Sequence, residues 1–378
     1  MIESSSSVEI FSQLFHSAKQ GQLSEDVFWF AHTLLLDAKN DALAHELWET
    51  WHLCTPGMAE RDILDTHVTA EHLQRVTDPM NAKILFRRSV KRIYLEISSY
   101  CNRRCTYCPN ALIDRISEKK FLPETILRSI FDNLGSIQYN GALFFHCYNE
   151  PLADPDLCEK IALSKQYCPN VQAMLYSNGD YINRDYLEKL HAVGLSHLTI
   201  SLHSNNGLWS ESEVQDRLDA ISRRLGLALH VEYSLPGQQM IASLSYKFPI
   251  RVMIGNYLVN GSNRGNLMPQ IVTYTNDNLN RPCQMPFEDM YIAWDGSILP
   301  CCHLHADAPE HQAFKIGNIA DFQNLFEAYA NSALVDWRRS VIAPTMRRPP
   351  CDTCIQTVHD ERVVTKMRNI YQQAIVTL

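Results

Sequence analysis

The stretch SSYCNRRCTYCPN, residues 98–110, decides the fold of this chain because it places three cysteines directly after a segment with strand character. Cys101, Cys105 and Cys108 follow the spacing C-x3-C-x2-C, and the apolar residues of IYLEIS (93–98) come before them. The loop contains no histidine and no fourth cysteine. Because iron–sulfur clusters are usually held by four thiolates, this spacing predicts a cluster with one iron open to a ligand from outside the protein.

The composition of the whole chain is that of an ordinary globular protein. It has 378 residues, of which 46% are hydrophobic and 20% are charged, and this length predicts two or three domains. The formal net charge of -8 argues against a nucleic-acid partner, and no segment resembles a signal peptide or a membrane span. We therefore expect a cytoplasmic protein whose twelve cysteines serve metal or redox chemistry rather than disulfides.

Strand and helix patterns alternate between about residues 89 and 274. Strand-like segments at 93–98, 142–148, 171–177 and 197–203 are each followed by an amphipathic helical segment, and two more strands are expected at 227–235 and 250–258. This alternation predicts an α/β domain with a parallel sheet and helical crossovers. Because six strands are fewer than the eight of a closed barrel, we predict a partial (β/α)6 barrel.

Residues 1–88 have a different pattern, with apolar residues at helical spacing in three successive segments. Ser24 and Asp41 are suitable N-caps for the second and third helices. The segment also contains Trp29, Trp48 and Trp51. We predict an N-terminal helical domain that packs a core of its own.

Residues 275–378 break the βα alternation and predict a small third domain. MYIAWDGSILPCC (290–302) has the pattern of a hairpin that turns at Asp295-Gly296, a dipeptide that favours a tight primed turn. One helix is expected over 321–340, and a polar helix closes the chain. The domain also contains five cysteines, namely Cys283, Cys301, Cys302, Cys351 and Cys354.

The first cysteine loop resembles that of the radical S-adenosylmethionine (SAM) enzymes, whose signature is C-x3-C-x-Φ-C with Φ aromatic. Tyr107 stands at Φ. The resemblance implies a 4Fe–4S cluster held by Cys101, Cys105 and Cys108, with the open iron bound to the amino and carboxylate groups of SAM. It also implies reductive cleavage of SAM to a 5′-deoxyadenosyl radical that abstracts a substrate hydrogen, and an electron donor such as flavodoxin or ferredoxin.

Three further strand ends carry polar residues at positions that the family uses to bind SAM. The candidates are Asn149 and Glu150 in HCYNEPL (146–152), Ser177 and Asn178 in YSNGD (176–180), and Ser201 in TISLH (199–203). The first of these replaces a GGEP-like element, with Tyr148 and Asn149 in place of both glycines. For each residue, a role in a turn or a cap is the alternative.

The C-terminal cysteines resemble those of the SPASM and twitch radical SAM enzymes. The family spacing G-x4-C, counted from Gly296, selects Cys301 over Cys302, which would be a buried apolar position. The resemblance implies one closed auxiliary 4Fe–4S cluster, as in the shorter twitch form, held by Cys283, Cys301, Cys351 and Cys354. A four-thiolate zinc ribbon is the rival interpretation. Three nearby histidines are expected beside the cluster or on the surface rather than as ligands; they are His303, His305 and His311.

Two reaction classes fit these motifs. We prefer modification of a peptide by oxidation, cross-linking or epimerisation in natural-product maturation, because a small substrate does not need the N-terminal domain. The alternative is a small-molecule dehydrogenase of the aminoglycoside-biosynthesis type, and a zinc-stabilised binding module without catalysis is the third possibility. The catalytic group stays open: Cys147 is a candidate hydrogen donor, and Arg264, in GSNRGN (261–266), is a candidate proton acceptor.

Overall fold

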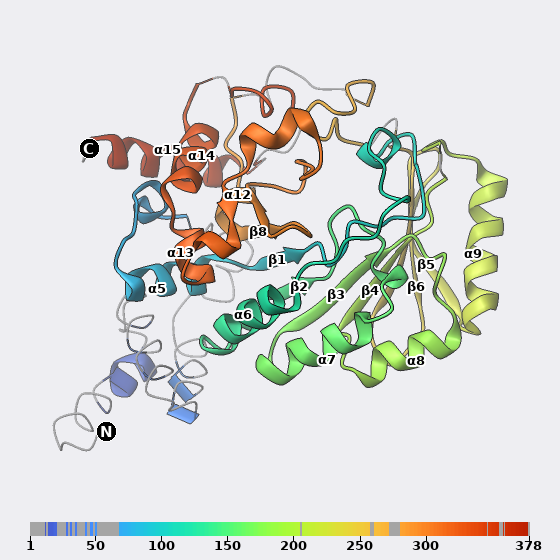
Figure 1. The fold of residues 1–378 in the computed structure, drawn as a ribbon, viewed down its shortest axis with the longest axis horizontal. Coiled ribbons are helices and arrows are strands. Elements are labelled where there is room, and N and C mark those ends of the chain that lie inside the picture. The colour runs from blue at the N-terminus through green and yellow to red at the C-terminus, as the bar shows by residue number, and fades with distance from the viewer. Residues whose placement is uncertain are drawn as a thin grey trace.

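The computed structural model describes residues 68–204, 206–257, 261–271, 280–345, 347–354, 358 and 360–376, with single positions and short runs between residues 12 and 50. The described residues form one ten-stranded sheet in the order β10-β9-β8-β1-β2-β3-β4-β7-β6-β5 (Figure 1). The strands are β1 (Arg92–Leu95), β2 (Ala142–Phe144), β3 (Gln172–Ser177), β4 (His197–Ser201), β5 (Leu229–Leu235), β6 (Gln239–Leu244), β7 (Ile250–Gly255), β8 (Asp289–Ile292), β9 (Ser297–Leu299) and β10 (Gly317–Asn318).

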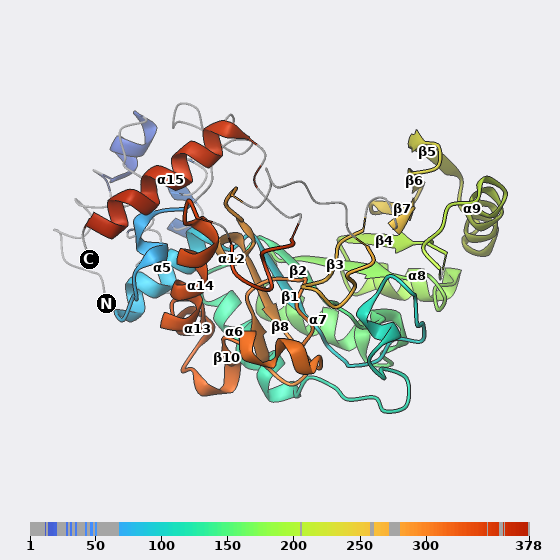
Figure 2. The same cartoon turned by 90° about the horizontal axis from the view of Figure 1, so that it is seen from above.

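The helices gather in two groups. The crossover helices follow one another along one face of the sheet, and the C-terminal helices lie beside β1 and α5 (Figures 1 and 2). Among the described residues, no helix is both long and apolar enough to cross a membrane. The helices are α5 (Pro79–Ser89), α6 (Glu124–Gly135), α7 (Leu157–Tyr167), α8 (Arg184–Ala192), α9 (Glu211–Leu225), α12 (Met285–Glu288), α13 (Leu325–Tyr329), α14 (Ser332–Ile342) and α15 (Glu361–Val376).

The expected βα alternation is present from β1 to β4. These strands and β7 pair in parallel, and α6, α7 and α8 form the crossovers between β1, β2, β3 and β4. Alternate strand residues such as Ile93 and Leu175 are fully buried in one hydrophobic cluster with helix residues such as Phe131 and Leu187. This packing explains the period-two and helical apolar patterns of the sequence, and it leaves the strand carboxyl ends together at one edge.

The opposite face of the sheet carries a row of aromatic side chains. Tyr94 of β1 stacks on Phe144 of β2 and on Tyr291 of β8, with ring centroids 4.5 and 4.6 Å apart. These residues are direct cross-strand neighbours in the parallel ladder. Because such pairs contribute about 0.5–1.5 kcal/mol each beyond the burial of their surface, the row helps to fix the register of the sheet.

The sheet differs from the expected one after β4. Residues 227–235 were expected to form another strand of the parallel sheet, but β5, β6 and β7 form an antiparallel meander, and β6 was not expected at all. Pro236-Gly237 makes the turn, with Gly237 at φ +75° and Gln238 N–H donating to Leu235 O (3.0 Å). A Pro-Gly pair marks a turn, and a short Gly-containing loop between two strand-like segments is consistent with a hairpin, which the βα interpretation overlooked.

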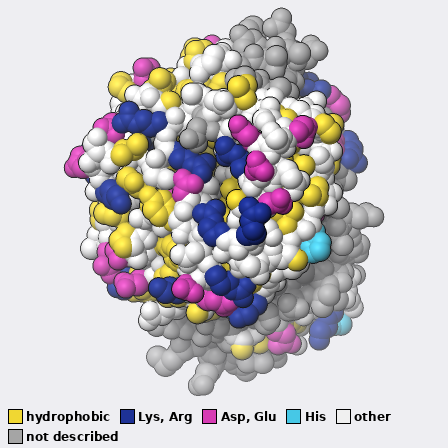
Figure 3. All heavy atoms as spheres, turned by 90° about the vertical axis from the view of Figure 1, so that its right-hand side faces the viewer, with side chains coloured by type: hydrophobic (Ala, Val, Ile, Leu, Met, Phe, Trp, Pro, Cys, Tyr) yellow, Lys and Arg dark blue, Asp and Glu magenta, His cyan; other side chains and the backbone are white. Residues whose placement is uncertain are grey.

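β5 is an edge strand of the sheet and is largely exposed to solvent. Its exposed apolar residues are Val231, Tyr233 and Leu235. On the side of the molecule that includes α9, hydrophobic side chains are interspersed with both basic and acidic ones (Figure 3).

The C-terminal hairpin is present but is part of the main sheet. β8 pairs in parallel with β1, and Arg92 of β1 donates from Nε to Asp289 Oδ1 of β8 (2.6 Å). The turn is not a primed one, because Gly296 has a φ of +81° while Asp295 has no positive φ. Gly296 N–H donates to Ala293 O (2.9 Å), so a longer loop ends on the left-handed glycine.

The helix expected over 321–340 is divided in two. Asn331 interrupts it and caps α14, its Oδ1 accepting from Leu334 N–H (3.0 Å), while Asn324 caps α13. An asparagine side chain at an N-cap accepts hydrogen bonds from backbone N–H groups of the first turn, which have no carbonyl partner within the helix. The break lets α13 pack on α5, where Phe86 meets Phe326 with ring centroids 5.2 Å apart.

The N-terminal segment is described only in part. Ser24, Asp41 and the three tryptophans lie outside the described residues. The described buried residues of this segment share one hydrophobic cluster with the sheet; they are Ala18, Phe28, Ala31, Leu35 and Leu47. These residues therefore pack on the α/β core, and the separate core expected for this segment is not supported by them.

Candidate active site

The carboxyl ends of the parallel strands surround a cavity of about 350 Å³. This edge is where α/β folds bind their ligands. The cavity brings together every candidate that the sequence assigned to the first cluster, to SAM or to catalysis. They are Cys101, Cys105, Tyr107, Cys108, Cys147, Asn149, Glu150, Ser177, Asn178, Ser201 and Arg264.

The cysteine loop is a compact, hydrogen-bonded turn. Cys108 N–H donates to Cys105 O (2.9 Å), and Cys101 N–H donates to Arg115 O (3.1 Å). No disulfide joins the described cysteines, and burial raises the pKa of Cys101 to about 12 and also raises the pKa of Cys108. Desolvated thiols such as these need a positive centre before they ionise, which fits an iron–sulfur cluster at this cavity wall.

Arg115 holds this loop against the end of β1. Its side chain is almost fully buried and donates from Nη1 to Glu96 Oε1 and to Ser99 O, both at 3.0 Å. Its Nε also forms an ion pair with Asp307 Oδ2 (2.9 Å) from the C-terminal region. One buried arginine therefore links the first cysteine loop, the central strand and the last third of the chain.

A second arginine ties the loop to β3. Arg103, between the first two cysteines, forms an ion pair with Asp180 of the YSNGD segment. Asn102 Nδ2 also donates to Asp180 Oδ2 (2.7 Å), and Asn178 Nδ2 donates to Asn102 Oδ1 (2.8 Å). The YSNGD segment thus positions the cysteine loop, in addition to its expected place in the cavity wall.

Glu150 is the polar centre of the cavity wall. Its Oε1 accepts from Ser177 Oγ (2.7 Å) and from Leu152 N–H (3.0 Å), while Oε2 accepts from Asn178 N–H (2.7 Å). Burial raises its pKa to about 7 in spite of these three donors. The neighbouring Asn149 accepts from Cys147 N–H at Oδ1 (3.0 Å) and so closes the same turn.

Aromatic rings form the wall next to the cysteines. Tyr107 stacks on Tyr257 with ring centroids 4.1 Å apart and an interplanar angle of 11°. His203 packs edge-on against Tyr257, and its Nδ1 accepts from Gly255 N–H (2.7 Å). Gly207 is required here, because an added Cβ would lie 2.8 Å from Tyr107 Cδ1.

The four auxiliary cysteines converge in the C-terminal region. Burial, followed by the neighbouring thiols, raises the pKa of Cys301 well above its ordinary value. The thiols that act on it are Cys302, which has the largest effect, and then Cys351, Cys354 and Cys283. The four cysteines selected by the family spacing are therefore electrostatic neighbours and fit one closed cluster.

The comparison with protein families decides the identity of both centres. Residues 95–225 match the radical SAM superfamily, and residues 283–355 match the SPASM iron–sulfur cluster-binding domain. The chain is a radical SAM enzyme. It uses SAM and two 4Fe–4S clusters. The domain boundaries at 88 and 274 stay proposals.

Named relatives of this radical SAM enzyme are distant. The S-adenosyl-L-methionine-dependent 2-deoxy-scyllo-inosamine dehydrogenase of Niallia circulans is 23% identical over 248 residues, which cover 65% of this chain and 85% of the relative. GTP 3′,8-cyclase of Nautilia profundicola is 29% identical over 125 residues, which cover 32% of this chain and 37% of the relative. The solved structure of BtrN with AdoMet and 2-DOIA is similar in fold, with a TM-score of 0.50 and 20% identity over 70% of this chain and 92% of that one.

The family match bears on the zinc interpretation. Residues 283–355 match an iron–sulfur cluster-binding domain, which favours a cluster over a zinc ribbon at the auxiliary cysteines. Among the described residues, no group of three or more His, Cys, Asp or Glu side chains is close enough to hold a single metal ion.

The three histidines beside the auxiliary cysteines are buried and hydrogen-bonded, as expected for residues that support a site. His305 Nδ1 accepts from Asp307 N–H (3.2 Å), so its Nε2–H donates to Asn110 Oδ1 (3.2 Å) just after the first cysteine loop. His311 Nδ1 accepts from His305 N–H (2.9 Å), and its Nε2–H donates to Gly265 O (2.8 Å). This chain of bonds joins the C-terminal region to both sides of the SAM cavity.

Cys302 lines the SAM cavity, although the sequence predicted a buried apolar position. Tyr148 Oη donates to Cys302 O (2.9 Å) and fixes this segment against the end of β2. Cys147 lies in the same wall and is half-buried. Burial raises the pKa of the Cys147 thiol well above its ordinary value, so Cys147 stays protonated.

Sequence reasoning missed several residues of the cavity wall. His203 comes two residues after Ser201 in TISLH, and strand periodicity would have placed both on one face. Tyr257 lies two residues after the end of β7, but it belongs to no recognisable motif. The remaining missed residues are Tyr94, Arg103, Asn110, His146, Tyr148, Tyr176 and Cys302.

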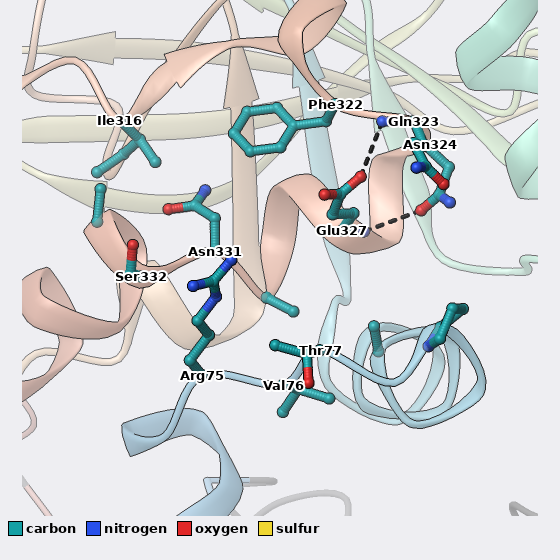
Figure 4. A pocket seen from close by; sticks show the side chains of 14 residues that line it. Arg75, Val76, Thr77, Ile316, Phe322, Gln323, Asn324, Glu327, Asn331 and Ser332 are labelled. Atoms are coloured by element: carbon teal, nitrogen blue, oxygen red, sulfur yellow. Dashed lines mark hydrogen bonds between the residues drawn. The ribbon is translucent and has the colours of Figure 1, made fainter.

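A second cavity, of about 400 Å³, lies between the start of α5 and the α13–α14 turn (Figure 4). Arg75 extends toward Asn331 in its wall, while Glu327 accepts from Gln323 N–H (2.8 Å). No cysteine or SAM-binding candidate lines this cavity. All the candidates for the first cluster, SAM and catalysis lie instead in the cavity at the strand ends.

Proposed function

We propose that this radical SAM enzyme is a dehydrogenase that removes two electrons from a small polar molecule. The observation that carries the proposal is the reach of the auxiliary region into the SAM cavity. Cys302 lines that cavity and follows Cys301, an expected ligand of the auxiliary cluster. An electron acceptor held by Cys301 would therefore be one residue away from the site at which the substrate reacts.

When bound, SAM and the two clusters supply a 5′-deoxyadenosyl radical and an electron acceptor. The substrate loses a hydrogen atom from carbon, which leaves as part of 5′-deoxyadenosine, and then one electron and one proton. An alcohol would thus become a carbonyl compound. The chain's own residues would hold the reactants: Cys101, Cys105 and Cys108 would bind the first cluster, and Glu150 would order the wall that faces SAM.

The relative from Niallia circulans supports the dehydrogenase proposal, because it is named as a SAM-dependent dehydrogenase and the match covers 85% of its length. This relative favours a small substrate over the peptide that the sequence alone suggested.

Modification of a peptide residue is the second candidate. It is favoured by the length of the segment before residue 89, which extends beyond both matched regions and which a small substrate does not require. In that case only one side chain of the peptide would enter the cavity. The same loss of a hydrogen atom, an electron and a proton would apply.

We further propose a cytoplasmic location and an electron donor such as flavodoxin or ferredoxin. No disulfide joins the described cysteines, which suits a reducing compartment. Reductive cleavage of SAM needs one electron per event, and small redox proteins of that compartment can deliver it.

The test is turnover with deuterium-labelled small alcohols and amines in the presence of SAM and a reductant. We expect deuterium in 5′-deoxyadenosine and a product that lacks two hydrogens. Cys354→Ala, checked for folding by circular dichroism, should still cleave SAM but form much less product. Full product formation by that variant would exclude the electron-acceptor role, and exclusive turnover of a peptide would establish the second candidate.

A further inference from the structure

We propose that Arg264 binds an anionic group of the substrate, a carboxylate or a phosphate, and that the auxiliary domain holds this arginine in position. The inference rests on the proposed function, because it concerns the substrate of the same cavity. It also replaces the role of proton acceptor that the sequence suggested for Arg264. A guanidinium that stays charged has five N–H donors and no acceptor.

The Arg264 side chain is a cation that has no hydrogen-bond or ion-pair partner among the described residues, and it lines the SAM cavity. The bonds of this residue are those of its backbone: its N–H donates to Ser262 Oγ (3.2 Å), and its carbonyl oxygen accepts from Leu267 N–H (3.3 Å). The other two arginines near this cavity, Arg103 and Arg115, are both paired with carboxylates. An unpaired guanidinium at a cavity wall offers a fork of donors that matches carboxylate or phosphate oxygens.

The neighbouring side chains do not neutralise this charge. Tyr148 and Tyr257 feel the charge of Arg264, and burial keeps the pKa of each of them above its usual value. Glu150, the carboxylate among the lining residues, is engaged with Ser177, Asn178 and Leu152. An anion that enters the cavity would therefore be the first charge partner of Arg264 that does not belong to a metal centre.

The backbone at Arg264 is strained. Arg264, Gly265 and Asn266 have φ angles of +50°, +60° and +73°, so three successive residues lie in the left-handed region. Residues other than glycine avoid this region, and where they occupy it the surrounding structure must compensate. Such outliers concentrate at sites that bind ligands, which is the inference we draw for Arg264.

The compensation comes from the auxiliary domain. Thr353, between the two cysteines of the CxxC pair, accepts from Asn263 Nδ2 (2.6 Å) and donates from Oγ1 to Asn266 Oδ1 (2.5 Å). His311 Nε2–H donates to Gly265 O (2.8 Å), and an added Cβ at Gly265 would lie 3.0 Å from the same nitrogen. Binding of the auxiliary cluster and placement of Arg264 are thus linked through Thr353, a positioning residue.

The experiment titrates anaerobically reconstituted enzyme, saturated with SAM, with ¹³C-labelled acetate and with inorganic phosphate, and follows the NMR signals of the probes. Acetamide is the uncharged control. We expect Arg264→Gln to weaken binding of both anions by about tenfold or more. The affinity of Arg264→Lys should lie between those of the wild type and Arg264→Gln, because lysine keeps the charge but lacks the forked N–H donors of a guanidinium. The exposed Arg251→Gln is the matched control and should bind as the wild type does.

Thr353→Val should lose the same anion binding at unchanged iron content, and Thr353→Ser, which keeps the hydroxyl, should restore it. Equal anion affinity in wild type and Arg264→Gln would overturn the proposal. Loss of SAM affinity in Arg264→Gln would also overturn it, since the anion would then be the carboxylate of SAM. A shifted midpoint potential of the first cluster in Arg264→Gln, with anion binding unchanged, would overturn the proposal as well. SAM cleavage by the wild type is measured separately, so failure of the proposed function is recognised on its own.

Discussion

Glu150 shows how a single side chain organises the cofactor pocket. It accepts three hydrogen bonds from two strand ends, two at Oε1 and one at Oε2. A glutamine side chain has nearly the same shape as glutamate. Whichever carboxylate oxygen its NH2 group replaces, that group would face a hydrogen-bond donor instead of accepting from it. The carboxylate therefore matters for the geometry of the SAM-facing wall as well as for any direct contact with SAM.

We predict that Glu150→Gln destabilises the protein by about 1–3 kcal/mol, because at least one buried donor loses its acceptor, and that it weakens SAM binding. Anaerobic thermal unfolding and equilibrium dialysis with labelled SAM measure the two effects. Glu188→Gln, on the exposed surface of α8, is the control and should leave both values unchanged. A Glu150→Gln protein with wild-type stability and SAM affinity would show that this network is dispensable.

At the residue scale, the sequence predicted which residues belong to the site better than it predicted the contacts between them. The cysteine spacing was sufficient to assign Cys101, Cys105 and Cys108 to one site, because a three-thiolate loop has few other uses. The bonding of Asp180 to the cysteine loop could not be read from YSNGD, since it depends on where β3 lies relative to β1. Arg264 was noticed, but its left-handed backbone leaves no signal in the sequence.

At the scale of elements, the stacked pair Tyr107–Tyr257 depends on a tight turn at Gly207. Gly207 has a φ of +72°, and an added Cβ would also lie 3.2 Å from Tyr257 Cβ. Gly237, in the β5–β6 turn, has a similar φ of +75° but open space around it. Substituting each glycine in turn therefore separates the free-energy cost of the left-handed backbone from the effect of displacing the Tyr107 ring.

We predict that Gly207→Ala and Gly237→Ala each lose about 1–2 kcal/mol of stability, since both force alanine into the left-handed region. Only Gly207→Ala should also weaken SAM binding, because Tyr107 must move. Denaturant unfolding and SAM dialysis of the two variants, side by side, provide the measurement. Equal SAM affinity in both variants would contradict the role given to the Tyr107 stack.

The elements were predictable where local pattern and fold agree. The strands β1 to β4 and their helices follow from apolar periodicity, because each strand has one helix-covered face. The β5–β6 hairpin was not predicted because residues 227–235 follow a helix, as the strands of the preceding βα units do, and the Pro-Gly turn alone does not distinguish the two arrangements. The break between α13 and α14 was missed because Asn331 is a cap only when the chain turns there.

At the scale of the whole molecule, the C-terminal region is built into the catalytic unit. β8 extends the central sheet, and Arg115 bridges Glu96 and Asp307 across it. From the sequence this region was predicted to be a separate small domain, because the pairing between β1 and β8 joins segments about 200 residues apart. Such pairing has no local signal, so only the three-dimensional structure reveals it.

Arg115→Met should destabilise the protein by about 3–5 kcal/mol, because it leaves the buried carboxylate of Glu96 without its partner. Arg104→Met is the control: Arg104 pairs with Asp114 at the exposed surface, where such a pair contributes about 0–1 kcal/mol. Chemical unfolding under anaerobic conditions measures both. Equal destabilisation by the two substitutions would mean that Arg115 does not join the two cysteine regions.

The central claim is that an open cluster in the strand-end cavity cleaves SAM while a separate closed cluster completes the oxidation. The most direct measurement is 5′-deoxyadenosine formation together with iron content, for the wild type and for a variant with Cys101, Cys105 and Cys108 all replaced by alanine. We predict about eight irons and SAM cleavage in the wild type, and about four irons without cleavage in the triple variant. Wild-type rates of 5′-deoxyadenosine formation by the triple variant would contradict the account.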